Sequence, residues 1–440
     1  MIKSIEIKNF KSIKTKYFPL RNLNVLLGLN GMGKSTFIQS LLLLKQSQNI
    51  RNGRIDLNGV YTKIGSTKDA LYQYSKQSDL AFEIIFDNKE RLNLEFEYKM
   101  ESDFFQVKST SIITGNENLY RVLVGAIEGL NNRLHNNREI VTDSLLSPDL
   151  VTTYLKQNSI ELINPTFENI GDLSSLSVLK QSLFTNNFQY LNASRIDPTS
   201  VNQKNYSSVI DTRNVGSHGE FTAHFIEVYF NDELSFEKLL HKDSRIKDSV
   251  TGKELVNTTL INQINLWMGE ISPGVNIRTT SISSDYVLLE YVFKQRNFGN
   301  TNRYKPENVG FGISYVLPVV TSLLAARQGE LIIIENPESH IHPRGQVELG
   351  RLIALTAMNV PDVQIIIETH SDHILNGIRV AVKEGDISKD KVVAFYFDKV
   401  FADSEQYSQI TNIEIDQNGE LSDYPKHMLD EWSNQLLKLI

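Results

Sequence analysis

The hydrophobic and polar positions of the chain follow two different periods. In the last third, short apolar runs alternate with stretches of helical spacing. Strands and helices that alternate in this way favour an α/β fold, with a parallel sheet covered on both faces. The predicted strands are 331–335, 363–368 and 392–397, and the predicted helices are 314–327, 343–357 and 371–384.

The first fifty residues show the same alternation. Residues 2–8 alternate as a strand, residues 23–28 form an apolar run that ends at a glycine, and residues 34–46 have a helical apolar pattern. The order is therefore strand, glycine loop, helix. We expect the strand at 23–28 to join the later strands in one sheet, so that both ends of the chain build one domain and the middle is an insertion.

The middle of the chain changes period twice. Residues 79–114 alternate with period two, and Asp87-Asn88 separates the first two runs, which predicts an antiparallel β lobe. Residues 116–187 are rich in Asn, Ser and Leu with helical spacing, which predicts a helical insertion without the sustained heptads of a coiled coil. The other predicted elements are strands at 188–193, 275–282 and 285–294, helices at 219–230, 255–268 and 426–438, and a turn at 416–420 between two short strands.

The composition of the chain limits its possible size class, location and chemistry. The chain has 440 residues, enough for two or three lobes, and no apolar run of about 18 residues that would predict a membrane span. The start reads as a strand and not as a signal peptide. The absence of cysteine excludes disulfides, a thiol nucleophile and a zinc–cysteine site, and fits a cytoplasmic protein.

The charge balance argues against a broad grip on nucleic acid. The net charge is −7, whereas such a grip normally needs a basic face. The first sixteen residues do carry five lysines against one acid, Glu6, and this pattern favours a solvated edge hairpin over a binding patch.

A phosphate-binding loop is the clearest motif. Gly28-Leu29-Asn30-Gly31-Met32-Gly33-Lys34-Ser35 fits G-x-x-x-x-G-K-[ST] at every fixed position, between a predicted strand and a predicted helix. Glycines let successive N–H groups turn toward phosphates, and the helix start adds its positive end. Lys34 would neutralise the β- and γ-phosphates and Ser35 would bind Mg²⁺. The motif predicts ATP with magnesium.

A carboxylate ends the apolar strand LIIIE. Glu335 would reach the magnesium ion from beside the phosphate loop, directly or through water. Ser35 and Glu335 are thus the expected metal ligands.

The motifs together resemble a known family. IEIKNFKSI, GLNGMGKST, ENPESHIHP and IIIETHSDH are similar to the ABC-type ATPase heads of the SMC, Rad50, RecF and OLD group, and most similar to single-chain bacterial AAA ATPases with an E-N-P-E-x-H-x-H-P motif. The resemblance covers residues 1–48 and 305–440 with specific motifs, and 188–226 more loosely.

The resemblance implies a role for several residues. Glu335 would be the Walker B acid, His370 the histidine that senses the γ-phosphate, and residues 340–343 the loop that meets a second subunit. Residues 308–314 stand where the ABC signature stands, without being LSGGQ, so Gly310, Gly312 and Ser314 would contact a phosphate across a dimer interface. The implied nucleotide-binding residues are Lys11, Ser12, Asn30, Gly31, Met32, Gly33, Lys34, Ser35 and Thr36.

One position departs from the family. ABC heads have a water-activating glutamate after the Walker B acid, and Asn336 stands there in this chain. A neutral amide can orient water but cannot take its proton in the usual way. Glu338 is the next carboxylate and would substitute, with His370 assisting. Hydrolysis is therefore expected to be slow, which would leave a long-lived ATP-bound dimer.

Some residues have competing interpretations. The spacing of His340, His342, His370 and His373 also suits a transition metal. Arg195 follows a predicted strand and would contact phosphate, a neighbouring lobe or a structural ion-pair partner. The loop 216–220 is similarly open between structure and function.

We expect an ABC-type head with an antiparallel β lobe and a helical insertion. The expected division is 1–115 for the N-terminal part of the head, 116–187 for the insertion, 188–304 for a middle lobe and 305–440 for the C-terminal part of the head.

The resemblance implies an ATPase that dimerises around ATP, or forms a higher oligomer, and controls a separately encoded nuclease or toxin, often in bacterial anti-phage defence. A nucleotide-gated scaffold with little turnover and a DNA-repair or recombination ATPase acting directly on DNA are the alternatives. A transporter ATPase does not fit the signature, an SMC-type tether would need a long coiled coil, and an OLD-type nuclease would need an acidic Toprim domain after His370.

Overall fold

The computed structural model describes most of the chain. The described residues are 1–47, 54–99, 104–113, 119–122, 180–247, 254–295, 299–402, 404–426 and 428–439. The predicted helical insertion at 116–187 lies outside them except near its two ends. At the first end, Leu119–Val122 form the strand β7, so the expectation of helix is wrong for these four residues. Among the described helices, none combines the length and the apolar character needed to cross a membrane.

The chain divides into two compact units, each described by itself. The first unit contains Met1–Leu20, Asn30–Thr185 and Phe397–Ile410, and the second contains Arg21–Leu29, Asn186–Tyr396 and Thr411–Ile440. The chain therefore passes from one unit to the other several times. The phosphate loop begins in the second unit and continues in the first.

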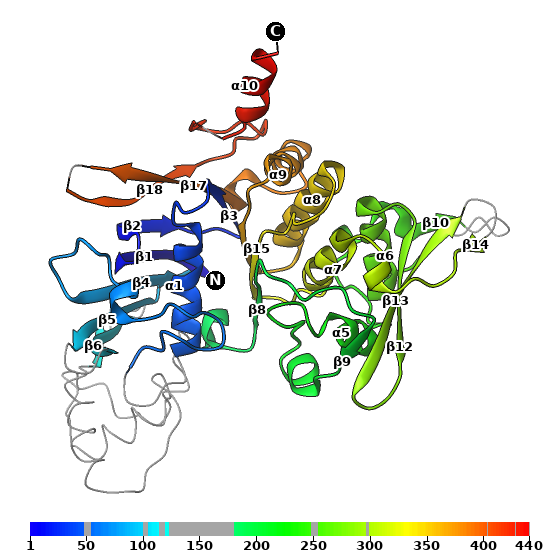
Figure 1. The fold of residues 1–440 in the computed structure, drawn as a ribbon, viewed down its shortest axis with the longest axis horizontal. Helices are drawn as coiled ribbons and strands as arrows, with labels where there is room; N and C mark the ends of the chain where they lie inside the picture. The colour runs from blue at the N-terminus through cyan, green and yellow to red at the C-terminus, as the bar shows by residue number, and fades with distance from the viewer. Residues whose placement is uncertain are drawn as a thin grey trace, which may run out of the picture. The chain divides into compact units, whose positions relative to one another are not determined.

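A six-stranded sheet contains the strand that leads into the phosphate loop. Its order is β18-β17-β3-β16-β15-β8, and the pairs β8–β15, β15–β16 and β16–β3 are parallel (Figure 1). Strands from both ends of the chain are thus neighbours, which confirms the α/β prediction. The bounds are β3 Leu23–Gly28, β8 Phe188–Leu191, β15 Leu331–Glu335, β16 Gln364–Glu368, β17 Val392–Phe401 and β18 Gln406–Ile413.

The apolar runs explain why these strands are central. Every residue of β16 and the first four residues of β15 are buried, as expected for parallel strands covered on both faces. The helix α8, Pro343–Asn359, lies beside α9, Asp372–Glu384, in Figure 1. Two glycines allow this close packing: a Cβ on Gly350 would lie 2.4 Å from the Ile374 carbonyl oxygen, and one on Gly377 an equally short distance from α8.

A second, antiparallel sheet also belongs to the second unit. Its main pair is β12–β13, with β14 and β9 each paired to β13. The helix α6 packs on β12, and α7 packs on α6. The bounds are β9 Val201–Gln203, β12 Val275–Ser281, β13 Tyr286–Gln295, β14 Gly299–Asn300, α5 Thr222–Val228, α6 Leu260–Ile271 and α7 Phe311–Leu324.

The first unit holds an antiparallel sheet of the order β2-β1-β4-β5-β6-β7. The lysine-rich start forms the β1–β2 hairpin at its edge, as predicted. The helix α1 belongs to the same unit, and its Phe37 ring lies 4.5 Å from the ring of Phe18 on β2. The bounds are β1 Ile2–Phe10, β2 Ile13–Pro19, β4 Asp79–Phe86, β5 Arg91–Lys99, β6 Phe104–Ile113, α1 Lys34–Ser47 and α2 Thr67–Ala70.

Several predicted stretches differ from the structure, among them the helix at 426–438, which begins only at Glu431. The predicted helix at 255–268 begins only at Leu260, and its first residues belong to the strand β11. The helix expected at 314–327 begins three residues earlier, at Phe311. The strand β18 covers Gln406–Ile413, whereas the sequence predicts only a short strand, without bounds, before the turn at 416–420. The remaining short elements are β10 Arg245–Lys247, β11 Glu254–Val256, η4 Ser182–Phe184, η5 Ser207–Asp211, η6 Glu237–Leu239, η7 Lys242–Ser244, η8 Pro306–Asn308, η9 Lys389–Lys391 and α10 Glu431–Leu437.

Candidate functional site

The phosphate loop has the backbone that its glycines predict. Gly28, Gly31 and Gly33 have φ angles of 129°, 78° and 110°, values that residues with a side chain rarely adopt. The loop leaves β3 at Gly28 and enters α1 at Lys34, whose side chain is buried. The helix start therefore follows the glycine loop directly, as a phosphate site requires.

Lys11, Ser12 and Thr36, predicted from the resemblance to bind nucleotide, lie together in the first unit. Lys11 has a left-handed φ of 50°, and its Nζ donates a 2.8 Å hydrogen bond to Oε1 of Gln39 on α1. Burial lowers the pKa of Lys11. The Ser12 hydroxyl lies 3.3 Å from the Thr36 hydroxyl, so the turn between β1 and β2 contacts the first turn of α1.

The candidate catalytic residues stand at the carboxyl ends of parallel strands in the second unit. Glu335 on β15 is in register with Glu368 on β16, and Glu368 is in register with Leu26 on β3. Gly28, where the phosphate loop begins, is two residues beyond Leu26 on that strand. The start of the loop and Glu335 therefore belong to the same edge of the sheet, where ligands of open α/β sheets bind.

Glu335 is held by two residues of the β8 region. The Tyr190 hydroxyl donates to Oε1 of Glu335 at 2.7 Å. Arg195 donates from Nη2 to the Glu335 carbonyl oxygen at 2.8 Å and from Nη1 to the Asn336 carbonyl oxygen at 3.2 Å. Burial raises the pKa of the Glu335 carboxyl, and the Tyr190 hydrogen bond and the Arg195 charge oppose this.

Arg195 therefore acts on the main chain of the acidic strand end. Burial lowers the pKa of its guanidinium to about 10. The sequence left its partner open, and the structure gives it two carbonyl oxygens. Sequence reasoning missed Tyr190 entirely, because nothing in the run FQYL distinguishes a tyrosine that binds a carboxylate from one that fills a core.

Asn336 has an unusual backbone and an unsatisfied side chain. Its φ is 45°, in the left-handed region that asparagine tolerates better than most residues, and its N–H donates to the Glu368 carbonyl oxygen at 2.8 Å. Its Oδ1 is buried and has no hydrogen-bond partner among the described residues. A buried amide oxygen without a donor is costly, and a water molecule would satisfy it.

Glu338 ties two loops together. Its Oε2 accepts from the Thr369 hydroxyl at 2.8 Å, and its Oε1 accepts from the His370 backbone N–H at 2.9 Å. The loop after β15 is thereby fastened to the loop after β16. Each carboxylate oxygen accepts one hydrogen bond, and the bond from the His370 N–H gives Glu338 a positioning contact with the residue expected to sense phosphate.

The signature-like segment packs against the same loop. Gly310 is the N-cap of α7, and a Cβ on Gly312 would lie only 2.3 Å from the His340 carbonyl oxygen. The Ser314 hydroxyl lies 3.3 Å from the Tyr291 hydroxyl. Within the unit, therefore, Gly312 allows α7 to pack closely on the loop after β15, and Ser314 contacts Tyr291. A Cβ on Gly310 would meet nothing within 4 Å.

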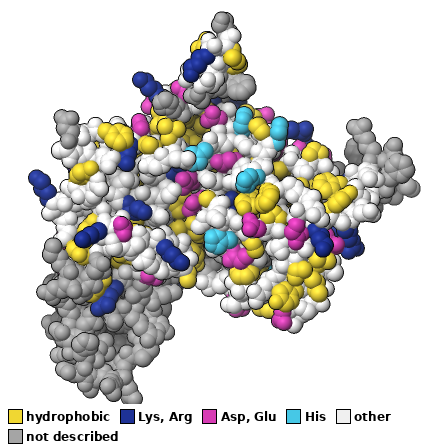
Figure 2. All heavy atoms as spheres, viewed as in Figure 1, with side chains coloured by type: hydrophobic (Ala, Val, Ile, Leu, Met, Phe, Trp, Pro, Cys, Tyr) yellow, Lys and Arg dark blue, Asp and Glu magenta, His cyan; other side chains and the backbone are white. Residues whose placement is uncertain are grey.

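The four histidines considered as metal ligands do not form a cluster. His340, His342, His370 and His373 are all exposed, and Figure 2 shows histidine side chains gathered with acidic ones over the region of α8 and α9. His342 instead caps α8, with its Nδ1 accepting from the Arg344 N–H at 3.3 Å. Within the described stretches, no three of these histidines bring ligand atoms together.

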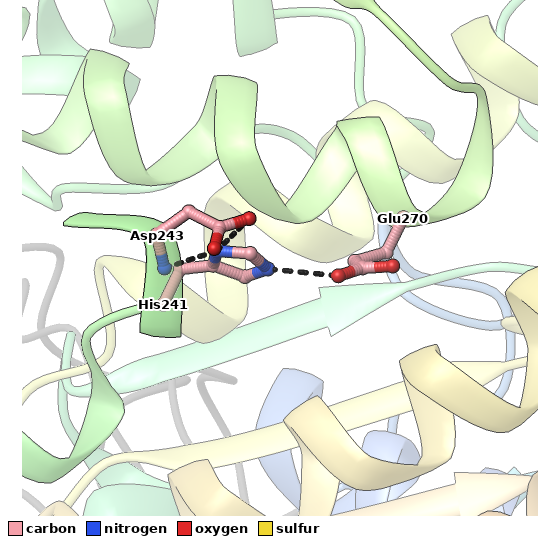
Figure 3. Close-up of side chains that lie close together, drawn as sticks. All are labelled: His241, Asp243 and Glu270. Atoms are coloured by element: carbon pink, nitrogen blue, oxygen red, sulfur yellow. Dashed lines mark hydrogen bonds and ion pairs between the residues drawn. The ribbon is translucent and has the colours of Figure 1, made fainter. Parts of the chain in front are cut away.

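A different group, His241, Asp243 and Glu270, has ligand atoms within 4.8 Å of one another. Figure 3 shows the two carboxylates on opposite sides of the imidazole ring. Nδ1 accepts from the Asp243 N–H at 3.2 Å, and Nε2 lies 3.2 Å from Oε1 of Glu270, which also pairs with Lys242 at 3.0 Å. Both ring nitrogens of His241 are engaged and Lys242 pairs with the Glu270 carboxylate, so this group forms a hydrogen-bond network that joins η7 to the end of α6.

Comparison with known proteins gives one family for most of the chain. A family model described as an AAA ATPase domain matches residues 1–375. A second model, described as a protein of unknown function, matches residues 387–439. A search of curated proteins returns no match.

Solved structures of SMC heads are loosely similar. The SMC head bound to the C-winged helix domain of ScpA is 11% identical with a TM-score of 0.49, over 94% of this chain and 98% of that chain. The SMC head of Thermotoga maritima is 10% identical with a TM-score of 0.41, over 94% and 99%. The SMC head with an extended coiled coil, bound to the C-terminal domain of ScpA derived from Pyrococcus furiosus, is 12% identical with a TM-score of 0.43, over 100% and 99%.

Proposed function

The chain belongs to the AAA ATPase domain family, and from this we propose that it binds Mg²⁺–ATP at Gly28–Ser35, hydrolyses it slowly, and uses the ATP-bound state to assemble with a second copy. One observation carries the proposal: the strand that leads into the phosphate loop and the strand that ends in Glu335 present their carboxyl ends at one edge of a parallel sheet. In open α/β sheets this edge is where ligands bind.

We assign the phosphate contacts to the loop. The backbone N–H groups of residues 30–33 would surround the phosphates, and Lys34 would neutralise them. Ser35 and Glu335 would hold Mg²⁺, which prefers the hard oxygen ligands that a hydroxyl and a carboxylate supply. When bound, the ion would neutralise charge on the β- and γ-phosphates. The contacts of Tyr190 and Arg195 support this role for Glu335, because they fix its orientation before any ligand arrives.

Asn336 is the residue that we assign to the attacking water. Its unsatisfied Oδ1 can accept a hydrogen bond from water, but a neutral amide does not remove the proton. Glu338 uses both oxygens to hold Thr369 and His370, which supports a role in positioning His370 rather than in taking a proton. We expect slow turnover because Asn336 stands where the resemblance implies a glutamate, and because Glu338 is engaged with Thr369 and His370.

The two-subunit site is the next part of the proposal. Gly310, Gly312 and Ser314 would meet the nucleotide of a second copy, in the manner of an ABC signature. The open space at Gly310 supports this for the first position, whereas the local contacts of Gly312 and Ser314 limit their part to shaping the helix start. We also propose that the ATP-bound state controls a partner effector, such as a nuclease or toxin, in anti-phage defence. This part of the proposal rests on the family resemblance alone.

Turnover measurements on matched variants test the chemistry. Lys34→Ala should abolish ATP binding. Asn336→Asp keeps the size of the side chain and the tolerance for a left-handed φ while adding a carboxylate, so we expect turnover to rise by at least ~10-fold. An unchanged or lower rate would remove Asn336 from the water site. A Glu338→Ala rate equal to wild type would remove Glu338 from catalysis.

The alternatives separate in the same assays. Sedimentation with a non-hydrolysable ATP analogue should give a dimer that ADP does not give, and a monomer in both would contradict ATP-gated assembly. Negligible hydrolysis with ATP-induced oligomers would favour the nucleotide-gated scaffold. Hydrolysis that DNA stimulates would favour a repair or recombination ATPase acting directly on nucleic acid.

A further inference from the structure

We propose that Ser408, on the strand β18, is a positioning residue of the phosphate loop, which fixes the Met32–Gly33 peptide so that the Gly33 N–H faces the triphosphate. This inference rests on the proposed function, since it requires that the loop bind ATP. Ser408 belongs to the C-terminal stretch matched by the family of unknown function, and nothing in the motifs assigns it a role.

The geometry is confined to the first unit. Ser408 is 7% exposed, and its hydroxyl donates to the Met32 carbonyl oxygen at 2.6 Å. Its backbone N–H donates to the Ser12 carbonyl oxygen at 2.8 Å, and its hydroxyl lies 2.7 Å from the Ser12 hydroxyl. Two side-chain contacts and one backbone contact therefore hold Ser408 between the β1–β2 turn and the phosphate loop.

The donor pattern assigns one proton to each contact. A serine hydroxyl has one proton to donate and lone pairs to accept. Because Ser408 donates its one proton to Met32, the Ser12 hydroxyl donates to Ser408. The Thr36 hydroxyl, 3.3 Å from that of Ser12, in turn donates to Ser12. Hydroxyl chains of this kind strengthen each of their hydrogen bonds. Three hydroxyls, from α1, the β1–β2 turn and β18, thus form one chain, and its last member, Ser408, donates to the Met32 carbonyl oxygen.

Holding that carbonyl oxygen orients the next N–H. A peptide bond is planar and trans, so its C=O and N–H point in opposite directions. With the Met32 oxygen held toward Ser408, the Gly33 N–H must point to the other side of the peptide. Phosphate loops bind anions with N–H groups of this kind, and fixing one before the ligand arrives removes the cost of ordering it.

Gly33 shows how tightly the hydroxyls cover the loop. A Cβ at this position would lie only 2.3 Å from the Ser408 hydroxyl oxygen and 2.7 Å from that of Ser12. Gly31 has a similar positive φ but nothing within 4 Å of such a Cβ. The two glycines therefore differ: both are needed for the backbone, whereas only Gly33 also makes room for the Ser12–Ser408 pair.

The inference gives the C-terminal stretch a place in the nucleotide site. Residues 397–410 lie in the same compact unit as Asn30–Ser35, and Ser408 connects the two. The segment of unknown function would then be part of the ATP site and not an appended module.

Binding measurements on the full-length chain test the proposal. Ser408→Ala removes the hydroxyl, and we expect the affinity for Mg²⁺–ATP and Mg²⁺–ADP to fall by roughly 3–10-fold, as for one neutral hydrogen bond. AMP lacks the β- and γ-phosphates, so its affinity should not change. Ser408→Thr keeps the hydroxyl and should restore most of the triphosphate affinity. Gln409→Ala, on the exposed face of the same strand, is the matched control and should bind as wild type.

The outcomes separate the two proposals. Equal ATP affinity in Ser408→Ala and wild type overturns the role of Ser408, provided that Lys34→Ala has lost binding. An equal loss for ATP and AMP, or a loss that Ser408→Thr does not reverse, also overturns it, because it indicates general damage to the unit. Retained ATP binding in Lys34→Ala would instead contradict the proposed function itself.

Discussion

The Tyr190 hydroxyl donates a 2.7 Å hydrogen bond to Oε1 of Glu335, so a residue of β8 orients the carboxylate at the end of β15. Tyr190 is in register with Ile333, two residues before Glu335. Because side chains on a strand alternate between its faces, Ile333 and Glu335 share the face on which Tyr190 lies. The parallel pairing of two short strands thus produces the contact, although the two residues are 145 positions apart.

Removing this hydroxyl should destabilise the ligand-free protein. In Tyr190→Phe the largely buried Glu335 carboxylate loses a donor, and we expect a cost of about 1–3 kcal/mol. Urea unfolding would show a lower midpoint. Tyr286→Phe, at an exposed tyrosine of the same unit, should leave the midpoint unchanged. Identical midpoints for Tyr190→Phe and wild type would mean that the hydrogen bond has no net effect on stability.

The two glycines at the start of α7 should respond differently to alanine. Gly312→Ala places a Cβ 2.3 Å from the His340 carbonyl oxygen, and we expect a loss of about 1–3 kcal/mol, measured by thermal unfolding. Gly310→Ala meets nothing within 4 Å and should cost under about 1 kcal/mol, through the weaker helix-capping preference of alanine.

The same pair tests the signature-like role. If Gly310 faces the nucleotide of a second copy, Gly310→Ala should weaken ATP-induced dimerisation while the melting temperature stays near that of wild type. Normal dimerisation in Gly310→Ala would exclude that role. A melting temperature unchanged in Gly312→Ala would contradict the close packing against the loop after β15.

Lys45 should make stability depend on pH. It lies 4% exposed in the last turn of α1, donates to the Thr185 carbonyl oxygen, and burial lowers its pKa from 10.5 to about 8. Between about pH 8 and 10.5 the unfolded chain holds this proton and the folded chain does not. Stability therefore rises with pH across this window, and the cost of burying the charge is full below pH 8.

A variant that cannot titrate isolates the effect. Lys45→Met has no proton to release, so wild type should gain about 1–3 kcal/mol relative to it between pH 7 and 10. The difference in urea midpoints between the two proteins, followed over this range, measures the gain. Parallel pH profiles would show that the Lys45 pKa is the same in the folded and unfolded chains.

The sequence predicts best those elements whose local pattern favours one type of secondary structure. The run LIIIE predicts β15 to the residue, because a short run of β-branched apolar residues that ends in a charge is typical of a buried strand. The helix α8 begins at Pro343 as predicted, since proline fits the first turn of a helix. The run QYSQITNI of β18 mixes polar and apolar residues, so the sequence predicts a short strand before the turn at 416–420 but not where that strand begins.

The sequence by itself determined the phosphate loop, the acidic strand end, the α/β class and the residue types available for chemistry. These follow from local periods and from glycines at fixed spacing, which act within a few residues. Only the tertiary structure decided that Tyr190 holds Glu335, that Glu338 holds His370, and that Ser408 holds a carbonyl oxygen 376 positions away in the sequence. Such contacts depend on which strands become neighbours in a sheet, and a pattern read along one segment contains no information on its distant partner.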